Sequence, residues 1–219
     1  MILSDNTIRR YVLRKVIEVD PWVPEHVQPA GLDLTLGSDF VGLRDMSHPG
    51  YTEGPMRVLQ DAVLQYGGQY NLDDLDGIMV VDPKDPQAHG TISVHLRRGQ
   101  VYVLPPQGFA LARTAERFSL PNDIVGLLNG RSSLGRLGLF VHVTAGLFDP
   151  GWDGVGTLEL YNASPNPIAL HPGMRIAQLV FHRMDKPAAR PYAGKYQGAA
   201  GVQTSRIDRD WKGGDHGEG

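Results

Sequence analysis

The chain has 219 residues, of which 41% are hydrophobic, and it carries a net charge of −3 and no cysteine. This length suffices for a buried core, while the lack of cysteine excludes disulfides, thiol nucleophiles and thiolate zinc sites. The 27 glycines and 16 prolines favour many short strands and argue against a helical bundle.

Composition also limits partners and location. No block of lysine and arginine is present, so nucleic acid is not expected as a partner. No apolar run approaches the ~20 residues that cross a bilayer, so no membrane association is expected. The start, MILSDNTIRR, lacks the apolar stretch of a signal peptide, and a cytoplasmic location is expected.

The first predicted element is a short amphipathic helix over residues 4–16. Its apolar residues Ile8, Val12 and Val16 recur at helical spacing. Ser4 at its start can accept hydrogen bonds from the first free backbone amides.

A strand is predicted over residues 31–37. Here the sequence GLDLTLG alternates between apolar and other residues, with Leu32, Leu34 and Leu36 on one face. This pattern is typical of a half-buried strand.

Residues 44–91 are interpreted as an insertion, because they hold too few apolar residues for a core of their own. Within them a helix is predicted over residues 55–66, with Pro55 in its first turn and glycines at its end. The chain is therefore expected to form one domain over residues 1–211, followed by a polar, disordered tail over residues 212–219.

A succession of short strands is predicted after the insertion. The turn-forming segments LPPQG, LPND, DPGWDG, ASPNP and HPGM separate them, which favours a closed or two-sheet antiparallel β fold. The predicted strands cover residues 92–96, 101–104, 108–112, 124–128, 139–143, 156–161, 168–170 and 175–181.

The sequence GRSSLGR at residues 130–136 carries the densest group of polar side chains. The guanidinium groups of arginine and the hydroxyls of serine can donate hydrogen bonds to phosphate oxygens, and glycine lets backbone amides approach an anion. It is not a Walker loop, because the chain has no GxxxxGK[ST]. A solvated helix start or β-turn would have a similar composition, so the pattern leaves both interpretations open.

Two carboxylates and one histidine stand out near this motif. Asp149 heads a DPG turn, where turn capping is the commoner use of such a residue. Glu159 shares one strand face with Thr157 and Tyr161, and it becomes a candidate general base if that face lines a pocket. His142 is predicted to be a satisfied core histidine, and no histidine pattern indicates a metal site.

With these segments in place, the chain resembles the dCTP deaminase family of the trimeric dUTPase-like superfamily. The resemblance rests on MILSDNTIRR, VQPAGLDLTLG, GRSSLGRLGLFVHVTAGLFDPGW, TLELYN, HPGMRIAQLVF, RPY, KYQG and SRIDRD, in this order. It implies a mainly β fold, a distorted antiparallel barrel of jelly-roll-like (β-clip) type. It also implies a homotrimer with active sites between subunits.

The resemblance further implies hydrolytic deamination of dCTP to dUTP and ammonia without zinc. Zinc-dependent nucleobase deaminases use cysteine ligands, and this chain has none. Glu159 matches the catalytic glutamate, while Ser132 and Arg136 would orient the water and Glu159. Mg²⁺ would travel with the triphosphate, and dTTP would act as a feedback inhibitor.

Further positions match the nucleotide-binding residues of that family. They are Arg131, Ser132, Ser133, Arg136, Thr144, Ala145, Asp149, Thr157, Leu158, Tyr192 and Lys195. The loop of residues 131–136 would contact the triphosphate, and the backbone at Thr144 and Ala145 would hold the base. Asp149 would bind the deoxyribose 3′-hydroxyl.

The C-terminal part of the resemblance contains two departures, of which one is the unusually short link from Tyr192 to Lys195. Thr157 and Leu158 would pack near the base, and Tyr192 and Lys195 would close over the phosphates. Where the family has a nucleotide-contacting glutamine, this chain has Ala199. A modified or differently phosphorylated deoxycytidine nucleotide is therefore an alternative substrate, and a non-catalytic nucleotide sensor is an alternative function.

The product is a further open point. In Thr144-Ala145-Gly146, the glycine resembles bifunctional members that form dUMP and pyrophosphate, whereas some plain deaminases have a histidine there. Asp149 would then help to activate a second water. A simple dUTPase is disfavoured, because dUTPases have a shorter PRSGLA-like loop and no glutamate beside the base.

Overall fold

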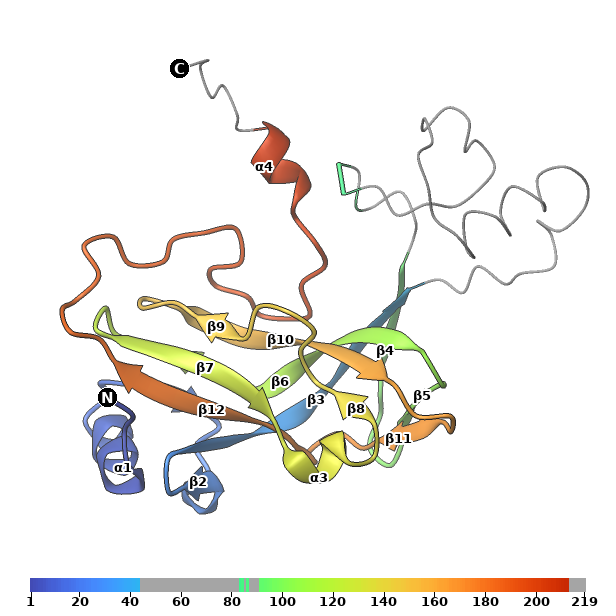
Figure 1. Cartoon of the computed structure of the whole chain (residues 1–219), viewed down its shortest axis with the longest axis horizontal. Helices are drawn as coiled ribbons and strands as arrows, with labels where there is room; N and C mark the ends of the chain where they lie inside the picture. Colours follow the sequence, from blue (N-terminus) through green and yellow to red (C-terminus); the bar gives the residue numbers. More distant parts are fainter. Residues whose placement is uncertain (44–82, 85, 87–90, 213–219) are drawn as a thin grey trace, which may run out of the picture. The chain divides into compact units, whose positions relative to one another are not determined.

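The computed structural model describes residues 1–43, 83–84, 86 and 91–212 (Figure 1). Its contacts divide the chain into one unit of Met1–Gly42 with Ser93–Thr204, and a second of Leu43–Ile92 with Ser205–Gly219. The described part of the second unit includes the short helix α4 (Asp208–Lys212). The helix predicted over residues 55–66 lies outside the described residues, as does the predicted tail beyond Lys212.

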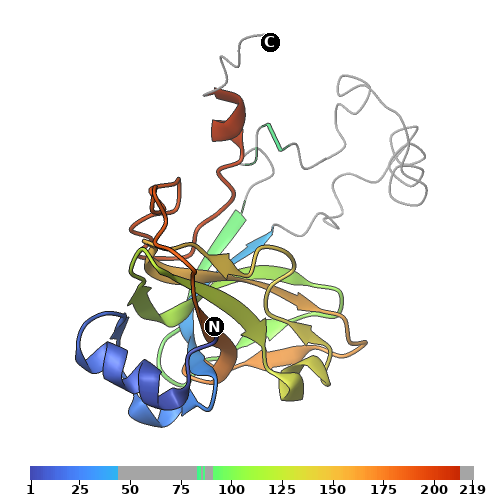
Figure 2. The ribbon, with the colours of Figure 1, turned by 60° about the vertical axis from the view of Figure 1, so that its left-hand side comes forward.

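The first unit is built from antiparallel strands, which confirms the predicted mainly β fold (Figures 1 and 2). A ten-stranded curled sheet has the order β8-β10-β6-β3-β12-β7-β9, with β1 beside β6 and both β2 and β4 beside β3. Strands β5 and β11 form a separate pair. The strands are β1 (Glu18–Asp20), β2 (Val27–Gln28), β3 (Gly31–Leu43), β4 (Thr91–His95), β5 (Tyr102–Leu104), β6 (Phe109–Ser119), β7 (Ile124–Gly130), β8 (Leu139–Phe140), β9 (Leu147–Phe148), β10 (Asp153–Asn162), β11 (Ile168–Leu170) and β12 (Arg175–Arg183).

Three helical segments complete this unit: α1 (Asp5–Leu13), the 3₁₀ turn η1 (Pro24–His26) and α3 (Ser132–Gly135). The predicted N-terminal helix is confirmed but is shorter than expected. Lys15 has a φ of 56° and turns the chain out of the helix. Val16, expected on the buried stripe, is consequently exposed, whereas Ile8 is buried. No helix in the described part of the chain is long and apolar enough to cross a membrane.

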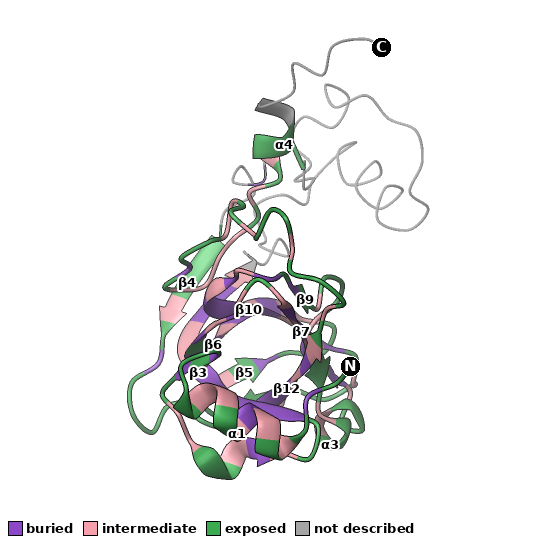
Figure 3. Cartoon of the chain, turned by 90° about the vertical axis from the view of Figure 1, so that its left-hand side faces the viewer, coloured by how far each residue is buried: buried purple, intermediate pink, exposed green. Residues whose placement is uncertain are grey.

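The core lies inside the curl of the sheet, where buried residues of β3, β6, β10 and β12 face one another (Figure 3). Leu32, Leu34 and Leu36 of β3 are all buried, as their alternation predicted. Apolar side chains on the inner faces of curled sheets supply most of the burial that stabilises such folds.

Strand β6 runs to Ser119, although the sequence predicted a strand only to residue 112. Its extension carries buried Thr114 and Glu116, and polar residues at inward positions hide the strand pattern. The Glu116 carboxylate accepts hydrogen bonds from the backbone N–H (2.9 Å) and the hydroxyl (2.7 Å) of Thr35. These bonds satisfy the buried carboxylate and join β6 to β3.

Candidate active site

Glu159 lies near the middle of β10, where it pairs with Leu111 of β6. Along this strand Thr157, Glu159 and Tyr161 are half-exposed, while Leu158 and the other intervening residues are buried. The alternation confirms the predicted face for Glu159. The side chain of Leu158, on the opposite face, is 0% exposed and belongs to the core.

The Glu159 carboxylate is held by the backbone of the segment that follows β8. Its Oε2 accepts hydrogen bonds from the N–H groups of Val143 (2.8 Å) and Thr144 (3.1 Å). The backbone N–H of Glu159 donates in turn to the Val141 carbonyl at 3.1 Å. Oε1 has no hydrogen-bond partner among the described residues, so one carboxylate oxygen is fixed and the other is available.

The same segment returns to the sheet at Gly146. The backbone N–H of Leu128 donates to the Gly146 carbonyl at 2.6 Å. A Cβ atom at this position would lie 2.8 Å from the Leu128 carbonyl oxygen, closer than real contacts allow. Glycine at position 146 therefore lets the segment that binds Glu159 lie directly against β7.

His142 differs from its sequence-based interpretation. It is half-buried rather than in the core, and its Nδ1 has no hydrogen-bond partner among the described residues. A Cβ at Gly146 would lie 3.6 Å from this nitrogen, so the imidazole lies beside Gly146. The prediction of a satisfied core histidine was wrong, because apolar neighbours in sequence do not determine whether a ring nitrogen finds a partner.

The GRSSLGR motif forms the short helix α3, and its polar side chains are exposed. Ser132, Ser133 and Arg136 make no side-chain hydrogen bond among the described residues. Arg131 is the exception, because its Nη2 lies 3.5 Å from Oδ2 of Asp33. The structure thus leaves two hydroxyls and one guanidinium available beside an anchored arginine.

Asp33 is a residue of this region that the sequence analysis did not single out. Its side chain is 1% exposed and lies 3.3 Å from Nη1 of Arg175, in addition to Arg131. Nε2 of Gln178 donates to its Oδ1 at 3.4 Å. The only sequence signal was a carboxylate within an otherwise leucine-rich alternating strand.

Asp149 heads the turn before β10, as expected, but its carboxylate does not cap that turn. The side chain is exposed and makes no hydrogen bond among the described residues, so turn capping was the wrong interpretation. The backbone of the turn holds the C-terminal segment, since the Tyr192 N–H donates to the Pro150 carbonyl at 2.8 Å. The Tyr192 ring packs on Trp152, with ring centroids 5.6 Å apart.

The C-terminal segment continues alongside β10. The backbone N–H of Val155 donates to the Ala199 carbonyl at 2.9 Å, and the Gln203 N–H donates to Oγ1 of Thr157 at 3.1 Å. Ala199 is buried against the strand. Lys195 lies with its Nζ 5.9 Å from the centroid of the Tyr196 ring.

The expected site residues fall into separate groups along β10. Helix α3 adjoins the end of this strand, where the Ala163 N–H donates to the Gly138 carbonyl. Tyr192 and Asp149 adjoin its start. Within the described chain neither Ser132 nor Arg136 hydrogen-bonds to Glu159, so the structure does not assemble the full expected set in one chain.

Metal donors are sparse in this region. Among the residues that the structure describes, no group of three His, Asp or Glu side chains could together hold a metal ion. The described donor set of one chain therefore does not by itself form a Mg²⁺ site.

Comparison with known proteins gives consistent relatives. A family described as dCTP deaminase-like matches residues 2–184. A Sulfurihydrogenibium protein named "dCTP deaminase, dUMP-forming" is 37% identical over 212 residues, covering 96% of this chain and 100% of that protein. A Haloarcula marismortui protein named "dCTP deaminase" is also 37% identical, covering 96% of both chains. The solved structure of the 2′-deoxycytidine 5′-triphosphate deaminase from Agrobacterium tumefaciens matches the fold with a TM-score of 0.55 and 26% sequence identity. The match covers 83% of this chain and 48% of the Agrobacterium chain.

Proposed function

The chain belongs to the dCTP deaminase-like family, and we propose that it hydrolyses dCTP first to the deaminated nucleotide and then to dUMP and pyrophosphate. The observation that carries the proposal is the Glu159 carboxylate, with Oε2 fixed by two backbone amides and Oε1 available. A carboxylate held in this way can accept a proton from water without reorienting.

In the first reaction, Glu159 removes a proton from water as the water oxygen bonds to C4 of cytosine, and it passes that proton to N3. Glu159 then takes the remaining proton from the C4 hydroxyl and delivers it to the amino group. As the C4=O bond forms, the C4–N bond breaks, and ammonia leaves. Water and dCTP thus give dUTP and ammonia, with the carboxylate restored. The backbone at Thr144 and Ala145 is suited to hold the base, because it adjoins the amides that bind Glu159.

The second reaction removes pyrophosphate from the deaminated nucleotide by attack of another water at the α-phosphorus. Asp149 is the candidate base, because its carboxylate is exposed and makes no hydrogen bond within the described chain. Two observations support dUMP over the initially expected dUTP. Relatives that cover 96% of this chain carry the dUMP-forming name, although one of equal coverage is named a dCTP deaminase, and Gly146 leaves no space for a side chain.

We further propose that the working form is a homotrimer in which α3 of one copy completes the site of another. Ser132 and Arg136 do not reach Glu159 within one chain, although they would be needed to orient the water. Apolar side chains are also exposed along the intervening segment, including Leu137 (61%) and Phe140 (54%). Exposed apolar groups beside an incomplete site are typical of a surface covered by another subunit.

The remaining parts of the proposal concern the nucleotide. Mg²⁺, borne by the triphosphate rather than by protein ligands, would neutralise phosphate charge when bound. Arg131, Ser133, Tyr192 and Lys195 would bind phosphates, and Asp149 and Thr157 would contact the nucleoside. We retain dTTP as an inhibitor of the same site, and a cytoplasmic location.

A time course with the full chain, dCTP and Mg²⁺, resolved by anion exchange, tests the proposed function. We expect dUMP and pyrophosphate to appear together with ammonia, without accumulation of free dUTP. Accumulating dUTP would contradict the second reaction while supporting the first. Absence of ammonia from dCTP would contradict the proposal as a whole, and would favour the nucleotide sensor or a modified deoxycytidine substrate.

A further inference from the structure

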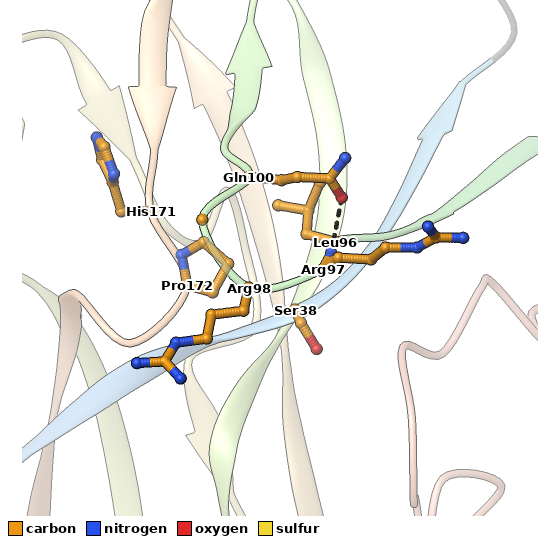
Figure 4. A pocket seen from close by; sticks show the side chains of 8 residues that line it. Ser38, Leu96, Arg97, Arg98, Gln100, His171 and Pro172 are labelled. Carbon is orange, nitrogen blue, oxygen red and sulfur yellow. Dashed lines mark hydrogen bonds between the residues drawn. The ribbon is translucent and has the colours of Figure 1, made fainter.

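A pocket of about 340 Å³ opens between the β4–β5 turn and the β11–β12 turn (Figure 4). None of its lining residues belongs to the candidate active site. Its volume lies within the range of about 300–1,000 Å³ usual for small-molecule sites. It is lined by Ser38, Leu96, Arg97, Arg98, Gly99, Gln100, His171 and Pro172.

The backbone that forms one wall of the pocket is well tied together. The Gln100 N–H donates to the Arg97 carbonyl at 3.0 Å, and the Gln100 side chain accepts from the Arg97 N–H at 2.7 Å. Gly99 completes this turn with a φ of 85°. The Leu96 N–H donates to the Ser38 carbonyl at 2.9 Å, which attaches the turn to β3. The arginines therefore project from a preformed turn.

The opposite wall is attached to the same strand. The Met174 N–H donates to the His171 carbonyl at 3.1 Å, and the Gly173 N–H donates to the Leu36 carbonyl at 2.7 Å. Both walls are thus fixed to β3, so the pocket exists without a ligand.

The pocket carries uncompensated positive charge. Arg97 and Arg98 are exposed, and neither has an acidic partner among the described residues. The carboxylate next to Ser38 along β3 does not neutralise them, because Asp39 is already engaged. Its oxygens lie 2.6 Å from Nδ1 of His95 and 2.6 Å from Nε of Arg113.

We propose that this pocket is a second anion-binding site, which takes a small molecule carrying at least two phosphate groups. Figure 4 shows the Arg97 and Arg98 side chains extending from the turn in opposite directions, and both are exposed, so both would turn towards the pocket to bind one ligand. Guanidinium groups bind phosphate oxygens through paired N–H donors. Ser38 adds a hydroxyl, and Leu96 and Pro172 supply apolar wall.

Titration calorimetry with inorganic pyrophosphate, and with inorganic phosphate for comparison, tests the proposal on the full chain. The test variant is Arg97→Gln/Arg98→Gln, and the matched control is Arg10→Gln/Arg14→Gln, which removes two exposed arginines of the α1 region. We expect pyrophosphate to bind the wild type more tightly than phosphate does. Its affinity should fall at least about tenfold in the test variant, the scale of losing charge-assisted hydrogen bonds, and stay unchanged in the control.

Arg136→Gln separates this pocket from the candidate active site. Pyrophosphate binding to the pocket should persist in that variant, and Arg97→Gln/Arg98→Gln should keep wild-type deamination of dCTP. Circular dichroism of each variant checks folding. The proposal is overturned if the wild type binds no pyrophosphate, if Arg136→Gln alone abolishes binding, or if the two double variants lose affinity equally. None of these three binding results depends on whether dCTP is the substrate.

Discussion

At the scale of single residues, the chemistry depends on how the two oxygens of Glu159 differ. Backbone amides fix Oε2, so the position of Oε1 follows from the main chain rather than from a flexible side chain. Such preorganisation lowers the reorientation required during proton transfer. The same amides belong to Val143 and Thr144, next to the backbone assigned to the base.

The first prediction concerns Asp149. Asp149→Asn should lower dUMP formation by about 100-fold, the usual scale for loss of a general base. Deamination should continue at saturating dCTP, where a weaker contact of residue 149 with the nucleoside does not limit the rate, so dUTP should accumulate. Anion-exchange analysis of the products measures both rates. Asp185→Asn, another exposed carboxylate, is the control and should behave as wild type; an unchanged product ratio in Asp149→Asn would exclude the assigned role.

The second prediction concerns Gly146. A methyl group there would meet the Leu128 carbonyl at 2.8 Å, so Gly146→Ala must shift the segment that binds Glu159. We expect a loss of about 1–3 kcal/mol in unfolding free energy, typical of overpacking, and at least a tenfold slower deamination. Urea unfolding and ammonia release measure the two effects. Gly201→Ala, where a Cβ meets nothing within 4 Å, should change neither.

At the scale of elements, most strands could be predicted from the sequence, whereas the extension of β6 and three of the shortest strands could not. The alternating leucines of β3, and Leu158 and Leu160 of β10, correctly predicted which face of each strand is buried. Strand β6 extended further than predicted because Glu116 is buried with hydrogen-bond partners on β3, and partners distant in sequence leave no local signal. The two- and three-residue strands β1, β2 and β9 were missed because they are too short for a period to be recognised.

Strand β4 supplies the third prediction, because His95 at its end binds Asp39 of β3. Partial burial acts to raise the pKa of Asp39, but hydrogen bonds and charges of His95 and Arg113 outweigh it and hold that pKa below its ordinary value. The contribution to stability is therefore present above the unfolded-state pKa of about 3.9 and is lost as the pH falls through the folded-state pKa.

Asp39→Asn should accordingly cost less than about 1 kcal/mol at pH 7, since the side chain is 33% exposed and solvent screens the pair. The difference from wild type should shrink towards zero as the pH falls below the folded-state pKa. Urea unfolding of both proteins at pH 7 and at pH 2–3 measures it. An equal difference at the two pH values would mean that the charge of Asp39 contributes nothing.

At the scale of the whole molecule, sequence motifs identified the family and the position of Glu159. They did not reveal that Ser132 and Arg136 lie apart from Glu159 in one chain, because that depends on how α3 attaches to the far end of β10. The role of Asp33 was equally hidden, since its partners Arg131 and Arg175 are about 100 and 140 residues away in sequence. Local patterns do not encode such long-range pairs.

The fourth prediction concerns assembly. Phe140→Asp should convert the proposed trimer largely to monomer, because it introduces a charge into a surface proposed to be covered. Deamination should fall by at least about 100-fold, since α3 of another copy would no longer orient the water. Light scattering after size-exclusion chromatography measures the mass. Leu13→Asp, at an exposed apolar residue of α1, should leave both unchanged; an active Phe140→Asp monomer would contradict the shared site.

The most direct test of the central claim is ammonia release from dCTP by Glu159→Gln, measured together with dCTP binding. The glutamine side chain keeps an oxygen that can accept hydrogen bonds from the backbone N–H groups of Val143 and Thr144. It cannot, however, take a proton from water. We expect deamination to fall by about 10²–10⁴-fold, with dCTP affinity within a few-fold of wild type. Deamination at the wild-type rate in this variant would contradict the assignment of Glu159 as the general base.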